Sequence, residues 1–191
     1  MGQGYKAVIL ASYSDEVEHA GQGGKEFIRT WVDPHQYLSN GYKLMEHSYI
    51  RNHFVEGVEY LLSPEGMFYK SRLVWAGDYA DNEPQEEENL NFLTQDELNK
   101  AKMSVPVAPP MGSYRYVVNH SRKEYFTKST TKSIFIVHPL PLLTAEGNGR
   151  GGGDYRGTHM EHVGTWARDV ISVEKEIPAN YTERVFDFSL D

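Results

Sequence analysis

Cysteine is absent from this sequence of 191 residues. Its absence excludes disulfide bonds, thiolate zinc sites and cysteine nucleophiles, and it suits a reducing compartment. Long apolar runs are also lacking, because no stretch approaches the roughly 18 residues of a membrane-spanning helix. The first residues lack the basic and apolar segments of a secretory signal. We therefore expect a cytosolic protein that neither spans nor binds a membrane.

Positive charge is in short supply, since 19 Lys and Arg residues stand against 27 Asp and Glu residues, a formal net charge of −8. Such a field repels polyanions, so we expect no direct binding of nucleic acid and favour partners with basic surfaces. Six of the carboxylates fall between Asp78 and Glu88. A run of this kind usually forms a solvated loop, and mimicry of DNA is the less common alternative.

The length favours one hydrophobic core, and we expect a single α+β domain over residues 1–191. The proline-rich segment 104–112 is predicted to be an extended crossover within that domain. Apolar runs and alternating patterns predict strands, with two antiparallel hairpins, one turning at 119–122 and one closing the chain across 178–180. The predicted strands cover residues 5–11, 27–32, 68–76, 114–118, 124–127, 134–137, 165–177 and 183–190.

Helical spacing of apolar residues predicts one long helix over 41–62, capped by Ser39 or Asn40 and stopped at 63–66. A short helix is predicted after Thr94, because Thr94 and Glu97 stand at capping-box spacing. The predicted fold class is therefore α+β: a largely antiparallel sheet with one long helix packed on it.

Six of the 17 glycines fall within residues 146–157. Glycine-rich backbone can form a nest of amides for an anion, with Arg150 and Arg156 beside it to pair phosphate or carboxylate; a plain surface connection is the alternative. The spacing of Gly147, Gly149 and Gly152 matches a dinucleotide fingerprint, but no helix is predicted after it, and we expect no cofactor.

The tripeptide Gly-Asp-Tyr occurs twice, at 77–79 after Trp75 and at 153–155. Two such loops at one end of a sheet would converge on a site, although aspartate in such a turn often only caps backbone amides. The candidate ligand-binding residues are accordingly Trp75, Asp78, Tyr79, His138, Gly149, Arg150, Gly152, Asp154, Tyr155 and Arg156.

The sequence offers little evidence of a catalytic motif, because it contains neither a Gly-x-Ser-x-Gly elbow nor a His-Glu-x-x-His pair. Its closest histidines are His159 and His162, to which Asp78, His138 or Asp154 would have to be added to hold a divalent ion. We leave catalytic residues unassigned and assign no metal. A metal-assisted hydrolase using these side chains stays as an alternative.

Four segments together resemble a group of uncharacterised small proteins encoded in phage and prophage genomes: 41–49, 74–81, 138–143 with the glycine-rich segment, and 164–169. The resemblance implies a context, an accessory factor that binds and redirects or blocks a host component. The leading hypothesis is therefore a phage-type accessory or counter-defence protein that binds a host protein or a small phosphorylated ligand. A structural component of the virion is a further alternative.

Overall fold

The computed structural model describes residues 3–11, 28–34, 43–84, 86–96, 108–130, 136–147, 155 and 157–189. The strands in these ranges are β1 (Tyr5–Leu10), β2 (Ile28–Val32), β3 (Ser71–Gly77), β4 (Tyr116–Asn119), β5 (Glu124–Thr127), β6 (Ala145–Glu146), β7 (Val170–Glu174) and β8 (Thr182–Glu183). The helices are α2 (Leu44–His47), α3 (His53–Leu61), α4 (Leu90–Asp96), α5 (Pro139–Leu143) and the 3₁₀ turn η3 (Met160–His162).

The strands form one sheet in the order β2-β1-β3-β7-β4-β5-β8, and β6 pairs with β3 off this path. Its pairs are antiparallel except β3 with β6 and β5 with β8. The expected largely antiparallel sheet is thereby confirmed. The predicted hairpin of β4 and β5 is present too, in a register that pairs Val117 with Phe126.

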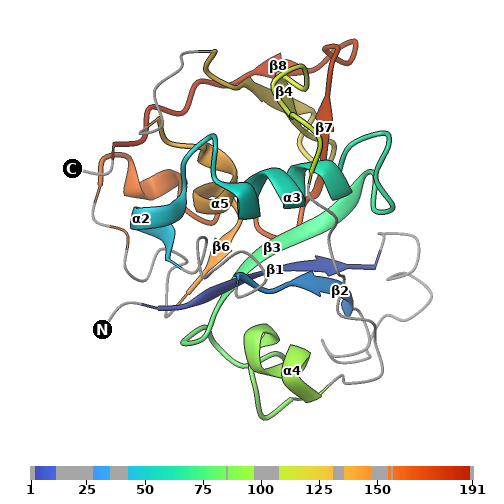
Figure 1. The fold of residues 1–191 in the computed structure, drawn as a ribbon. Helices are drawn as coiled ribbons and strands as arrows, with labels where there is room; N and C mark the ends of the chain where they lie inside the picture. The colour runs from blue at the N-terminus through green and yellow to red at the C-terminus, as the bar shows by residue number, and fades with distance from the viewer. Residues whose placement is uncertain are drawn as a thin grey trace.

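The centre of the sheet is covered on both faces. Alternate residues of β1 divide between two clusters: Tyr5, Ala7 and Ile9 join the large core that includes α3 and α5, whereas Val8 and Leu10 pack with α4. Figure 1 shows this layering, with α2, α3 and α5 on one side of β1 and β3 and α4 on the other. Burial of both faces explains why β1 is continuously apolar from Ala7 to Leu10.

The predicted long helix over 41–62 is wrong, because two helices, α2 and α3, occupy that region with a break between them. In the break, Tyr49 forms a β-bridge with Val137, and the Ile50 N–H donates to the Ile136 carbonyl. Asn52 then caps α3 by accepting from the N–H groups of the next turn. Tertiary pairing thus outweighs the local helical pattern. The proposed caps Ser39 and Asn40 lie outside the described residues.

The predicted closing hairpin is also wrong. Both edges of β7 are already paired, with β3 and β4, so no edge is left for the last strand. The chain instead crosses to β5, where β8 pairs in parallel. The short helix is displaced as well, since α4 begins at Leu90 with Asn89 capping the Phe92 N–H, and Thr94 is buried inside it. Of the proline-rich crossover 104–112, only residues from 108 onward are described.

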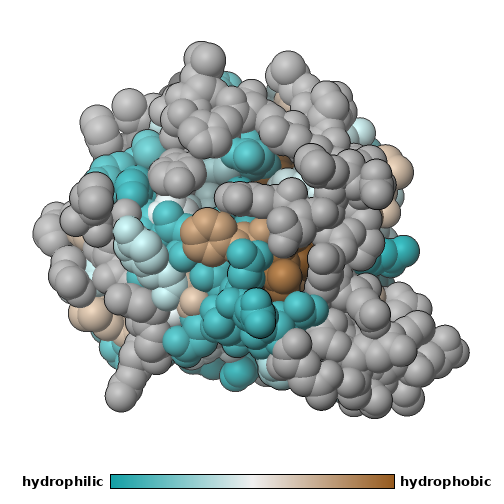
Figure 2. Space-filling model, turned by 90° about the horizontal axis from the view of Figure 1, so that it is seen from below, coloured by the Kyte–Doolittle hydropathy of each residue, from teal (hydrophilic) through white to brown (hydrophobic). Residues whose placement is uncertain are grey.

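The face that α4 covers is largely hydrophilic where the structure describes it. Figure 2 shows a small apolar area there, bordered by hydrophilic side chains. On α4 itself Phe92 is 38% exposed, while Leu90 and Leu93 are buried against the sheet. None of the helices in the described ranges has the length and apolar character needed to cross a bilayer.

Candidate functional site

Most of the glycine-rich segment lies outside the described residues, including the candidates Gly149, Arg150, Gly152, Asp154 and Arg156. Tyr155 is described and is fully buried. Its hydroxyl group donates to the carbonyl oxygens of Thr158, at 2.5 Å, and Ser189, at 3.1 Å. Tyr155 thus anchors the C-terminal segment and does not face a pocket.

The first Gly-Asp-Tyr turn has a structural role. Trp75 is buried and packs edge-on against Phe54. The Asp78 carboxylate accepts the Gly4 N–H at 3.0 Å, which is the backbone-capping role common for aspartate in turns. Tyr79 is 53% exposed. These three candidates do not converge on one cavity.

The two segments that carry Gly-Asp-Tyr nevertheless begin side by side, because β6 pairs Glu146 with Ala76 of β3. Arg168 forms ion pairs with a glutamate close to each of these two segments. Its Nε and one terminal nitrogen contact the Glu146 carboxylate at 2.6 and 2.8 Å, and its guanidinium also pairs with Glu83. Glu83 is consequently buried, so the acidic stretch is not solvated throughout as predicted.

His138 belongs to a buried trio with Glu59 and Lys128. The Glu59 carboxylate lies 3.0 Å from His138 Nε2 and 2.5 Å from Lys128 Nζ. The Leu140 N–H donates to His138 Nδ1, so Nε2 carries the proton that Glu59 accepts. Burial alone would raise the pKa of Glu59, but its two neighbours His138 and Lys128 lower it. Both ring nitrogens of His138 are therefore engaged in hydrogen bonds within the protein.

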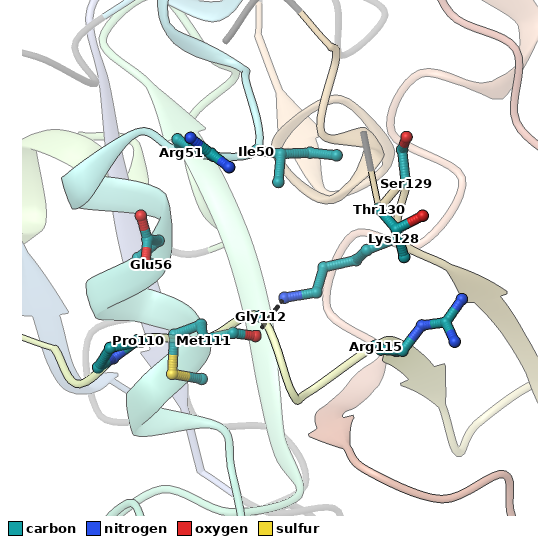
Figure 3. Close-up of a pocket in the computed structure, with 10 residues that line it drawn as sticks. All are labelled: Ile50, Arg51, Glu56, Pro110, Met111, Gly112, Arg115, Lys128, Ser129 and Thr130. Atoms are coloured by element: carbon teal, nitrogen blue, oxygen red, sulfur yellow. Dashed lines mark hydrogen bonds between the residues drawn. The ribbon is translucent and has the colours of Figure 1, made fainter. Parts of the chain in front are cut away.

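Lys128 connects this trio to a pocket of about 400 Å³. The pocket lies among three stretches far apart in sequence, namely the start of α3, the segment before β4 and the segment after β5, as Figure 3 shows. Lys128 Nζ also donates to the Met111 carbonyl at 3.1 Å, which fixes it in the wall. The lining residues are Ile50, Arg51, Glu56, Pro110, Met111, Gly112, Arg115, Lys128, Ser129 and Thr130.

The pocket is rich in positive charge. Arg51 and Arg115 stand on opposite sides of it (Figure 3), and within the described part of the chain neither guanidinium group has an ion-pair partner. Glu56 is the one carboxylate among the lining residues. Burial raises the pKa of Glu56, and the neighbouring Glu59 raises it further. Glu56 therefore loses its negative charge more readily, as the pH falls, than an ordinary glutamate does.

Sequence reasoning missed this pocket. Arg51 sits in the break between α2 and α3, a region predicted as continuous helix, while Arg115 and Lys128 flank a hairpin predicted correctly but with no functional motif. Nothing in their spacing brings them together. The Pro110-Met111-Gly112 stretch offers a turn signal, and the turn that begins at Met111 places the Met111 carbonyl beside Lys128.

A serine and a histidine also meet elsewhere. His120 Nε2 lies 2.7 Å from Ser172 Oγ, and Tyr181 contacts His120 Nδ1 at 2.9 Å. Burial, followed by the charge of Lys70, lowers the pKa of His120 to about 4. Ser172 is fully buried and its hydroxyl group also donates to Glu174 at 3.0 Å. A substrate cannot reach this serine, and the network serves to join β4, β7 and the C-terminal segment.

The histidines singled out by spacing, His159 and His162, do come together, and Glu161 joins them. Among the described residues, neither His138 nor Asp78 belongs to this cluster, so the larger metal site proposed from the sequence does not form with them. Asp154 lies outside the described residues. Comparisons of the chain with protein-family models, with curated proteins and with solved structures find no match.

Proposed function

We propose that the protein binds a small anionic ligand, of the phosphorylated class, in the pocket between α3, β4 and β5. The observation that carries this proposal is the pair Arg51 and Arg115, which lack ion-pair partners in the described part of the chain and stand across a cavity of about 400 Å³. Arginine recognises phosphate through two parallel N–H donors, and Lys128, whose charge Glu59 compensates, lies in the wall between them.

Size and lining support a molecule larger than a free ion. Ligand pockets usually measure about 300–1,000 Å³ and combine apolar walls with a few polar groups. Here Ile50, Pro110 and Met111 supply apolar surface, while Ser129 and Thr130 supply hydroxyl groups. A phosphate group between the arginines with an organic part against the apolar wall would use both.

Binding rather than turnover is the expected activity. The Lys128 amino group is held by Glu59 and the Met111 carbonyl, so its hydrogen bonds point into the protein and it is not placed to attack a ligand. A protein that sequesters a phosphorylated molecule would suit the phage accessory role that the sequence resemblance implies. A host protein, the other expected partner, would contact the outer surface and would depend little on the pocket arginines.

Isothermal titration calorimetry tests the proposal with adenosine monophosphate, ribose 5-phosphate and inorganic phosphate as probes and with uncharged adenosine as the matched control. We expect at least one phosphorylated probe to bind and adenosine to bind at least tenfold more weakly. Arg51→Gln and Arg115→Gln should each weaken binding by about tenfold or more, because a hydrogen bond to a charged group contributes about 1.5–3 kcal/mol.

Arg29→Gln is the control variant, since Arg29 is exposed on β2 at the opposite end of the sheet from β5. It should bind the probes as the wild type does. Absence of binding by the wild type to all three phosphorylated probes would overturn the proposal. Equal losses in all three arginine variants would overturn it as well, because they would indicate a general charge effect.

A further inference from the structure

A second cluster of chemically active side chains lies outside the pocket, on the turn η3. His159, Glu161 and His162 each offer a ligand atom, and these atoms lie within 4.8 Å of one another. His159 Nδ1 is 3.2 Å from Glu161 Oε1, and His162 Nε2 is 3.7 Å from the same oxygen. Three metal-ligating atoms thus point to one place at the surface.

These separations suit a tetrahedral ion. Zinc binds histidine nitrogen and carboxylate oxygen at about 2.0–2.2 Å, so two ligand atoms of a tetrahedral site lie about 3.4 Å apart. The separations of Glu161 from the two histidines, 3.2 and 3.7 Å, bracket this value, and the two histidine nitrogens lie within 4.8 Å of each other. Small side-chain rotations would therefore admit the ion without moving the backbone.

The backbone beneath the cluster is fixed at both ends. Before it, Thr158 Oγ1 donates to the Asp187 carbonyl and accepts the Ser189 N–H. After it, the Gly164 and Trp166 N–H groups donate to the last turn of α5. Both anchors tie η3 to segments far away in the sequence, so the three ligands are positioned in advance.

Two local features favour a ligand role over an incidental contact. His159 adopts φ of 55°, a left-handed conformation that costs a non-glycine residue energy and often marks functional positions. His162 packs edge-on against Phe186, with ring centroids 5.5 Å apart, which restricts its rotation.

We propose that His159, Glu161 and His162 form a binding site for a divalent transition-metal ion, with zinc as the leading candidate. Two imidazoles and one carboxylate favour transition metals over Mg²⁺ and Ca²⁺, which prefer sites made wholly of oxygen. All three side chains are at least partly exposed, so the fourth position faces solvent. Three protein ligands with an open position is the arrangement of catalytic zinc sites, and it gives the metal-assisted alternative a definite location.

The experiment uses the full chain with its affinity tag removed and stripped of metal. Calorimetric titration with Zn²⁺ should give one equivalent per chain, and Mg²⁺ should give no signal. Co²⁺, whose visible absorption reports its coordination, should give a tetrahedral spectrum. His159→Ala, Glu161→Gln and His162→Ala should each weaken Zn²⁺ binding by about tenfold or more, with the spectrum lost.

His53→Ala is the matched control, because His53 is exposed on α3 and lies outside the cluster. It should bind Zn²⁺ as tightly as the wild type does, and circular dichroism should show that every variant is folded. The proposal is overturned if the wild type takes up no Zn²⁺, or if the three cluster variants bind like His53→Ala. The phosphate probes play no part in this test, so its outcome is independent of the proposed function.

Discussion

Lys128 Nζ lies 2.5 Å from Glu59 Oε2, and both side chains are buried, with relative exposures of 6% and 0%. Glu59, on α3, also accepts from His138, so one carboxylate compensates a cation just after β5 and a ring N–H just before α5. Burying charge costs free energy unless each group is paired and hydrogen-bonded. The same lysine lines the pocket, which couples the core to the candidate site.

Replacing Glu59 by Gln should therefore destabilise the fold strongly. The amide keeps the shape of the side chain but leaves the Lys128 ammonium group buried without an anion. Breaking one partner of a buried pair costs about 3–5 kcal/mol. Urea-induced unfolding of both proteins measures the difference in the free energy of unfolding.

Glu176→Gln is the control for that comparison, because Glu176 is exposed after β7. Its free energy of unfolding should stay within about 0.5 kcal/mol of the wild type. A Glu59→Gln protein as stable as this control would contradict the pairing of Glu59 with Lys128.

The pH dependence of anion binding should report on Glu56. Burial raises the pKa of Glu56, and among its neighbours Glu59 raises it further, while His53, Lys128 and the Met111 backbone lower it. A raised pKa means that the carboxylate takes up a proton early as the pH falls. Since protonation removes a negative charge that opposes Arg51 and Arg115, sulfate binding should tighten as the pH is lowered from neutrality.

Sulfate is the suitable probe because it does not itself titrate in this range. One unit charge in a partly buried pocket is worth about 1 kcal/mol, or about fivefold in affinity. Glu56→Gln should bind sulfate about fivefold more tightly at neutral pH and lose most of the pH dependence. Glu46→Gln, at an exposed position of α2, should retain the wild-type profile. A Glu56→Gln profile as steep as that of the wild type would assign the effect to another group.

Sequence reasoning succeeds where local pattern decides the structure. The apolar run of β1 and the hairpin of β4 and β5 depend on neighbouring residues, and both were predicted within about two residues. The prediction of a helix over 41–62 failed because the helix is interrupted by the bridge between Tyr49 and Val137, which lie 88 positions apart in the sequence. No periodicity within one segment carries information on such a partner.

The two candidate sites also differ in how far the local sequence could predict them. Histidine spacing pointed to His159 and His162, which lie within one turn, although Glu161 between them was overlooked. The pocket brings Arg51 next to residues 110–115 and 128–130, and this juxtaposition follows from the sheet order and not from any motif. Of the five predicted ligand-binding residues that the structure describes, His138 is linked to the pocket, since it shares Glu59 with the pocket residue Lys128.

Arg168 should control the order of the acidic stretch and the start of the glycine-rich segment. It pairs with Glu83 from one and Glu146 from the other, and these hydrogen bonds outweigh burial and raise the pKa of Arg168. Arg168→Gln should lower the free energy of unfolding by about 1–3 kcal/mol, because Glu83 is left buried without its cation. Amide hydrogen exchange at 83–89 should become faster.

Arg122→Gln offers the comparison, since Arg122 pairs with Asp169 at 3.0 Å but is 49% exposed. Exposed ion pairs contribute less than about 1 kcal/mol, so this variant should keep near-normal stability and exchange rates. Equal effects in the two variants would mean that burial of the Arg168 pair does not matter.

Gly157 should tolerate no side chain, because a Cβ atom there would overlap the Ser189 carbonyl oxygen and the Tyr155 hydroxyl group. Those atoms hold the C-terminal segment in place, and the oxygen belongs to rigid backbone, so the segment must move. Gly157→Ala should cost about 1–3 kcal/mol in unfolding free energy, as overpacked sites usually do. Gly112→Ala is the matched control, because a Cβ atom at Gly112 meets nothing within 4 Å.

Since η3 is anchored to this same C-terminal segment through Thr158, Gly157→Ala should also weaken Zn²⁺ binding, whereas Gly112→Ala should leave it unchanged. Equal unfolding free energies for the two alanine variants would refute the close packing at Gly157.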